Sequence, residues 1–117
     1  NIKSVMGIIN GTTNYILTKM SKEGRSFQDV LAEAKALGYA EADPSADIDG
    51  LDAAHKLTVL IALAFDTYIG LADIDTEGIR NIDILDISFA KNFGYAIKLL
   101  AIGKKTDSGI EAGVHPT

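Results

Sequence analysis

The sequence predicts an α+β domain in which an open mixed sheet carries helices packed mainly on one face. Strand-like segments lie at the two ends of the chain, and patterns typical of helices lie between them. The 117 residues, 47% hydrophobic and 23% charged, suit one compact core of ordinary composition. We therefore expect a single domain.

The two ends supply the predicted strands. Residues 2–9 are rich in β-branched and apolar side chains and run into a tight turn at Asn10-Gly11. Residues 95–104 and 109–114 flank the turn-forming stretch 106–109, which predicts a hairpin.

Four helices are predicted between these strands. The first covers about 12–22, with Thr12 or Thr13 as its N-cap. The second follows Ser26, which has an acidic residue three positions later, as in a capping box. The others cover 51–65, apolar on most sides, and about 83–92. Glycines that suit helix ends follow three of them: Gly24, Gly38 and Gly94.

Two intervening stretches are less regular. Residues 39–50 are polar, acidic and interrupted by Pro44, which predicts a loop. Residues 72–82 are mixed, and a short strand is expected around 77–79.

Composition excludes several classes of protein. Eleven basic residues against 16 acidic ones give a formal charge of −5, so we expect no nucleic-acid partner. The longest apolar run, 59–65, is far shorter than the roughly 20 residues that a membrane helix needs. With no cysteine, disulfides and thiolate chemistry are excluded, which agrees with a reducing cytosol.

The first candidate site is the turn from Asn10 to Asn14 at the start of a predicted helix. A glycine there lets a ligand approach the backbone, and free N–H groups favour an anion such as a carboxylate. An ordinary capped helix accounts for the same residues, and the turn alone does not decide between the two.

The second candidate is an acidic run that leads to Lys56. Its five carboxylates within twelve residues are Glu41, Asp43, Asp47, Asp49 and Asp52. They repel one another unless a cation lies among them. Asp52 and Lys56 are spaced i, i+4 on one helix face, which Val59 and Leu63 continue, so a partly buried pair is expected. A plain surface ion pair of roughly 0.2–0.5 kcal/mol fits the same spacing.

A calcium loop is the main alternative for this run. Ser45, Asp47, Asp49 and Gly50 match the first positions of the EF-hand pattern, but its final glutamate position falls on Lys56. The two histidines, His55 and His115, lack clustered metal-ligand spacing. We therefore expect no metal site.

Two long segments resemble the catalytic domain of the homoserine dehydrogenase family. They are 7–17 (GIINGTTNYIL) and the stretch formed by 38–44 (GYAEADP) with 47–57 (DIDGLDAAHKL). The shorter segments 77–79 and 94–99 also resemble family segments, in the family's order, so the resemblance covers nearly the whole chain. It is closer to the monofunctional enzymes than to the aspartokinase fusions.

This resemblance implies NADPH- or NADH-dependent reduction of L-aspartate 4-semialdehyde to L-homoserine, on the route to threonine, methionine and isoleucine. Lys56 would donate a proton to the aldehyde oxygen, and Asp52 would hold the lysine or the substrate. Glu41 would accept the substrate ammonium. The implied pocket is completed by Tyr39, Asp47 and the Gly11-Thr12 backbone.

The resemblance also implies what surrounds the chain. Residues 1–117 would be the substrate-binding, catalytic domain, truncated, with NADP or NAD bound mainly by an N-terminal domain that is absent; no G-x-G-x-x-G occurs here. The fragment alone would be inactive, and the enzyme a cytoplasmic homodimer. The alternative is a non-catalytic acidic module that binds a cation or a partner, in which Lys56 would point to solvent.

Overall fold

A computed structural model describes residues 3–117. The sheet is built from β1 (Ser4–Gly7), β2 (Asp75–Thr76), β3 (Leu99–Thr106) and β4 (Gly109–Pro116). The helices are α1 (Gly11–Glu23), α2 (Phe27–Ala36), α3 (Ser45–Ile48), α4 (Leu51–Phe65), the short 3₁₀ helix η1 (Leu71–Asp73) and α5 (Ile84–Asn92).

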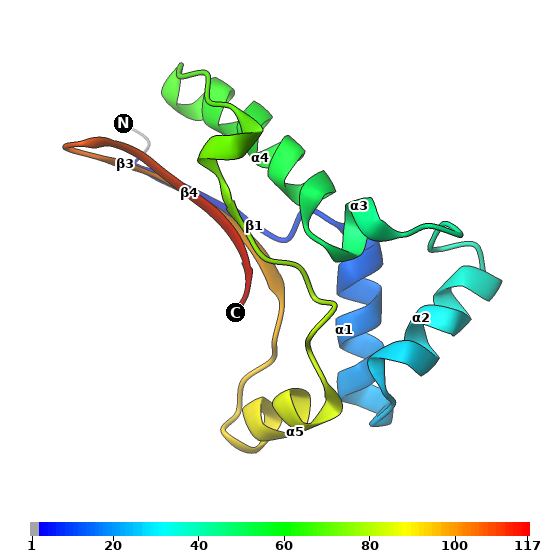
Figure 1. Cartoon of the computed structure of the whole chain (residues 1–117). Coiled ribbons are helices and arrows are strands. Elements are labelled where there is room, and N and C mark those ends of the chain that lie inside the picture. The colour runs from blue at the N-terminus through cyan, green and yellow to red at the C-terminus, as the bar shows by residue number, and fades with distance from the viewer. Residues whose placement is uncertain (1–2) are drawn as a thin grey trace.

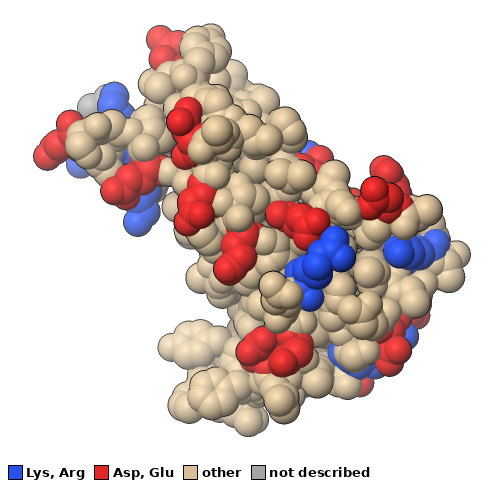
Figure 2. Space-filling model, in the orientation of Figure 1, with Lys and Arg blue, Asp and Glu red and all other residues tan. Residues whose placement is uncertain are grey.

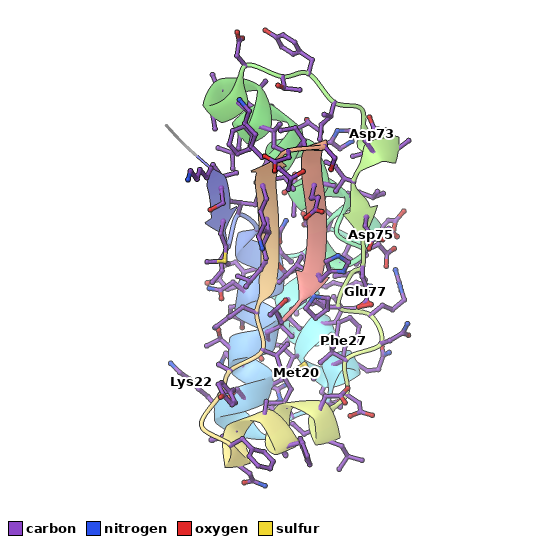
Figure 3. The ribbon with its side chains drawn as sticks, turned by 90° about the vertical axis from the view of Figure 1, so that its left-hand side faces the viewer. Met20, Lys22, Phe27, Asp73, Asp75 and Glu77 are labelled. Carbon is purple, nitrogen blue, oxygen red and sulfur yellow. The ribbon has the colours of Figure 1, made fainter. Side chains whose placement is uncertain are left out.

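The sheet is open and mixed, with strand order β1-β3-β4-β2. The β3–β4 hairpin is antiparallel, β1 is antiparallel to β3, and β2 is parallel to β4. Helix α4 packs along one face, α1 and α2 lie beyond its lower end on the same side, and α5 lies below the sheet, where it contacts α1 (Figure 1). Figure 3 looks onto the other face, where no helix of the described chain lies in front of β3 and β4. The predicted fold class is confirmed.

The core lies between α4 and the sheet and continues between α1 and α2. Helix α4 turns Leu57, Ile61 and Phe65 inward at a spacing of four residues, onto Ala101 and Val114 of the hairpin. Val59 and Leu63 lie on the other side of this helix and are 58% and 79% exposed. The expectation that they carry the Asp52–Lys56 face into apolar surroundings is therefore wrong.

The helix ends follow local capping chemistry, with one correction. Ser26 Oγ accepts a hydrogen bond from the Asp29 amide, and Gly24 ends α1 in the left-handed region at φ 65°. The N-cap of α1 is Asn10, neither Thr12 nor Thr13. Its side chain accepts from the Thr13 amide, so the helix begins earlier and both threonines lie in its first turn.

Several strand and loop segments also differ from expectation. The short strand expected at 77–79 lies two residues earlier, where Asp75 and Thr76 pair with Gly113 and Val114. The acidic loop contains the four-residue helix α3, which follows Pro44. Strand β3 begins only at Leu99, and β1 covers Ser4–Gly7, while Ile2 of the predicted strand lies outside the described residues.

No helix within residues 3–117 is both long enough and apolar enough to span a membrane.

Candidate functional site

The site is organised by Asn10, in the turn between β1 and α1. This residue is only 5% exposed. Nδ2 donates to Asp47 Oδ1 at 2.8 Å and to Asp52 Oδ2 at 2.9 Å, while Oδ1 accepts from the Thr13 amide at 2.8 Å. One buried amide thus joins the start of α1 to α3 and to the first turn of α4.

Lys56 joins the same network one turn further along α4. Its Nζ lies 3.0 Å from Asp52 Oδ2 and donates to the backbone oxygen of Ile9 at 3.1 Å. The predicted i, i+4 pair is therefore formed. The side chains of Lys56 and Asp52 are 53% and 34% exposed, so the pair lies at the surface rather than inside the core.

The charge on Asp52 is favoured by its partners. The hydrogen bond from Lys56 lowers the pKa of this carboxyl below its usual value, and the hydrogen bond from Asn10 adds to that effect. Partial burial acts in the opposite direction but does not prevail. Asp52 is consequently ionised at neutral pH and can hold a cation beside it.

The segment around Tyr39 reaches the same end of α1. Thr12 Oγ1 donates to the backbone oxygen of Tyr39 at 3.0 Å, and the Tyr39 ring meets Tyr15 edge-on with centroids 5.1 Å apart. A Cβ on Gly11 would meet no other atom within 4 Å, so the backbone there is open to a ligand. Glu41 follows two residues after Tyr39, and its exposed carboxylate forms no hydrogen bond or ion pair within residues 3–117.

The structure therefore brings together most of the predicted site residues. Asp47, Asp52 and Lys56 are joined through Asn10, and Thr12 is hydrogen-bonded to the backbone of Tyr39. Glu41 is placed near this end of α1 only because it follows Tyr39 by two residues in the chain. Sequence reasoning placed Asn10 only in the turn, because nothing local shows that its amide meets carboxylates 37 and 42 residues away.

The rest of the acidic run has other partners. Arg80 binds Asp49 through two nitrogens, each 3.0 Å from a carboxylate oxygen, and so provides a cation that the run requires. Asp43 accepts from the Ser45 hydroxyl, a bond that lowers the pKa of that carboxyl. Three positions of the calcium pattern, Ser45, Asp47 and Asp49, are thus bound by other side chains. Within residues 3–117 no group of three or more His, Cys, Asp or Glu side chains is placed to hold a metal.

Acidic side chains are also spread over the surface of the molecule. Figure 2 shows them spread from the upper end of the molecule to the lower helices, with basic atoms beside only some of them. Asp73, Asp75 and Glu77 follow one another along the segment from η1 through β2 at the edge of the sheet (Figure 3). This face is consistent with the formal charge of −5.

Comparison with known proteins gives one consistent result. The family model for homoserine dehydrogenase matches residues 1–117. The homoserine dehydrogenase of Neisseria gonorrhoeae is 55% identical over 116 residues, which are 99% of this chain and 27% of that protein. The chain thus spans about a quarter of the length of this relative.

Solved structures agree with the sequence matches. The crystal structure of a homoserine dehydrogenase from Thiobacillus denitrificans superimposes with a TM-score of 0.96 at 52% identity, over 99% of this chain and 27% of that one. A hyperthermophilic archaeal homoserine dehydrogenase, described in complex with NADPH, gives a TM-score of 0.79 at 35% identity, over 100% of this chain and 32% of that one.

The fold, the carboxylate–lysine network and these matches together define a domain of an oxidoreductase family that acts in amino-acid biosynthesis. The chain belongs to the homoserine dehydrogenase family.

Proposed function

We propose that this chain forms the substrate-binding, catalytic part of an enzyme that interconverts L-aspartate 4-semialdehyde and L-homoserine. The observation that carries the proposal is the Asp52–Lys56 pair, which is bound through Asn10 and Ile9 to the start of α1. A cation fixed beside a helix N-terminus and an acidic loop suits a substrate that carries an ammonium, a carboxylate and an aldehyde.

Lys56 donates the proton that the reduction requires. Adding hydride to the aldehyde carbon leaves negative charge on the oxygen, and a proton from the Lys56 ammonium completes the alcohol. Asp52 and Ile9 occupy two of the three N–H donors of Lys56, which leaves one donor for the substrate oxygen. Asp52 also keeps the ammonium in position.

The other groups bind the amino-acid end of the substrate. The N–H groups of Gly11 and Thr12 lie in the first turn of α1, where they have no acceptor in the helix and suit the substrate carboxylate. Glu41, exposed and close in sequence to Tyr39, accepts the substrate ammonium. Tyr39 and Asp47 complete the pocket. The alternative, a non-catalytic acidic module, fits less well because the Lys56 ammonium is held against Ile9 and Asp52.

The hydride source lies outside this chain. Within residues 3–117 the only parallel strand pair is the two-residue contact between β2 and β4, and no glycine-rich turn of a βαβ unit occurs, so these residues do not fit a dinucleotide cradle. We propose that NADP or NAD, which supplies the hydride when bound, is held mainly by a separate N-terminal nucleotide-binding domain of a longer polypeptide. That enzyme works in the cytoplasm as a homodimer, and residues 1–117 alone do not turn over.

The test is semialdehyde-dependent oxidation of NADPH by the longer enzyme that carries this chain. Replacing Lys56 with alanine removes the proton donor, so kcat should fall by roughly 10²- to 10⁴-fold. Lys56→Arg keeps the positive charge but is a far weaker acid, and should remain impaired.

The matched control is Lys105→Ala, which removes an exposed lysine of β3. Its kcat should stay close to that of the unaltered enzyme. If Lys56→Ala also retains full kcat while folded, the proton-donor role is excluded and Asp52–Lys56 is only a surface ion pair.

A further inference from the structure

Asn10 stands apart from the other polar residues of the site because it is buried and both N–H donors of its side chain are bonded to carboxylates. Nδ2 donates one hydrogen bond to Asp47 and one to Asp52. Oδ1 accepts from the Thr13 amide at 2.8 Å and lies 3.1 Å from the Thr13 hydroxyl, whose single hydrogen is shared with the Asn10 backbone oxygen at the same distance. A primary amide offers two donors and two acceptor lone pairs, and here both donors are engaged and the oxygen accepts from the Thr13 amide.

Only one orientation of this amide is compatible with its surroundings. Rotation by 180° would direct the oxygen at two carboxylates and the NH₂ group at the Thr13 amide, which is itself a donor. The side chain therefore fixes the two carboxylates and the start of α1 in a single arrangement. Asp52 Oδ2, which accepts from Asn10, is also the oxygen that lies 3.0 Å from the Lys56 ammonium.

We infer that Asn10 is a positioning residue of this site, which neutralises no charge itself but holds Asp47 and Asp52 close together and thereby sets where the Lys56 ammonium lies. The inference rests on the proposed function for its consequence in catalysis, though not for its geometry. Without the amide, two neighbouring carboxylates would repel each other, and Asp52 would carry Lys56 away from the start of α1.

The discriminating variant is Asn10→Asp. Aspartate is as good an N-cap as asparagine, so α1 should still begin at Gly11. The new carboxylate, however, faces Asp47 and Asp52 with an acceptor in place of the two donors. Asn14→Asp is the matched control, because it makes the same change one turn along α1, where the Asn14 oxygen accepts from the Lys98 ammonium instead.

The first measurement uses residues 1–117 and needs no activity. The Asp52 carboxyl is titrated by carbon-13 NMR in the unaltered chain and in both variants. Asn10→Asp should raise the apparent pKa of Asp52, since it removes a hydrogen bond and adds a like charge, while Asn14→Asp should leave that pKa close to the unaltered value. An unchanged titration in Asn10→Asp would overturn the inference.

The second measurement is the pH profile of kcat and KM in the longer enzyme. At pH 8, Asn10→Asp should lower kcat by about 100-fold, the effect expected of a misplaced catalytic group. The ratio to the unaltered enzyme should recover as the pH falls and the new carboxyl takes up a proton that it can donate again. A purely structural defect would not recover in this way, and a loss independent of pH would count against the inference.

Two further outcomes remain decisive. If Asn10→Asp does not fold at pH 8, Asn10→Ser keeps an N-cap oxygen but cannot bridge both carboxylates, and unaltered kcat in that variant would overturn the inference. If the unaltered longer enzyme shows no semialdehyde-dependent activity, the proposed function fails, and the Asp52 titration still decides the role of Asn10.

Discussion

Asp52 is held by two donors of different kinds, the charged Lys56 and the neutral Asn10. These bonds lower the pKa of its carboxyl in the folded chain below the ordinary value of 3.8. A lowered pKa in the folded state means that ionised Asp52 stabilises the fold above about pH 4. This contribution is lost as the pH falls through the lowered pKa.

At this residue we expect Asp52→Asn to weaken the fold at pH 7 more than at pH 3. At pH 7 the substitution should lower the free energy of unfolding by a few tenths to about 1 kcal/mol, because the Asp52–Lys56 pair lies at the surface. Urea unfolding of residues 1–117 at the two pH values measures it. Asp107→Asn, in the exposed turn between β3 and β4, serves as the control. An Asp52→Asn chain with the same loss of stability on acidification as the unaltered chain would contradict the argument.

Among the connecting elements, the linker between β2 and α5 lies tightly against the end of α3. The Ile79 amide donates to Ile48 O at 2.7 Å. A Cβ on Gly78 would collide with that same oxygen and with Asp49 Cα. The backbones approach so closely here that only glycine fits between them.

Gly78→Ala should therefore destabilise the domain by about 1–3 kcal/mol, the usual cost of forcing extra volume into a packed contact. Thermal or urea unfolding of residues 1–117 measures it. The same substitution at Gly11 is the control, since a Cβ there meets no atom within 4 Å and alanine favours a helix. Equal stability of the two alanine variants would show that the linker can move away at little cost.

Helix ends that are set by neighbouring residues could be predicted from the sequence. Ser26 caps α2, Asp83 caps α5, and Gly24 ends α1, each through bonds within a few residues. Strand β2 could not be placed correctly, because its two residues are defined only by pairing with Gly113 and Val114 far along the chain. Helix α3 has four residues, too few to show an apolar period.

In the candidate site, too, the local contacts could be predicted from the sequence and the long-range contacts could not. The spacing of Asp52 and Lys56 on one helix predicted their ion pair, which is formed. Asn10 and Arg80 were not predicted as partners of the acidic run, because both meet it across more than 30 residues of sequence. Their contacts depend on how α1 and the linker pack against α3 and α4.

Across the whole molecule, the sheet has one face covered by helices and one left bare within the described chain (Figures 1 and 3). Met6 and Ile102 are cross-strand partners on that bare face, and Met6 is 69% exposed. An exposed apolar pair on the uncovered face of a sheet suits a second copy of the same surface. This supports the proposed homodimer.

We expect the longer enzyme to sediment as a dimer and a Met6→Asp, Ile102→Asp double variant to shift it towards monomer. Charges at the centre of the contact would be buried without partners, which strongly opposes association. Analytical ultracentrifugation measures the change, with circular dichroism to confirm folding. Leu63→Asp, on the exposed side of α4, should remain dimeric. Dissociation by Leu63→Asp, but not by the double variant, would place the interface elsewhere.

The pairing of β1 with β3 also sets the order in which the chain can fold. Ser4 lies opposite Lys104, so the first described strand finds its neighbour only after almost all of the chain has been made. Helices α1 and α2 can pack on each other long before that, because their contacts are local. The closing of β1 onto the hairpin is therefore a late and slow event, and Ile9 and Asn10, in the turn that follows β1, gain their final positions with it.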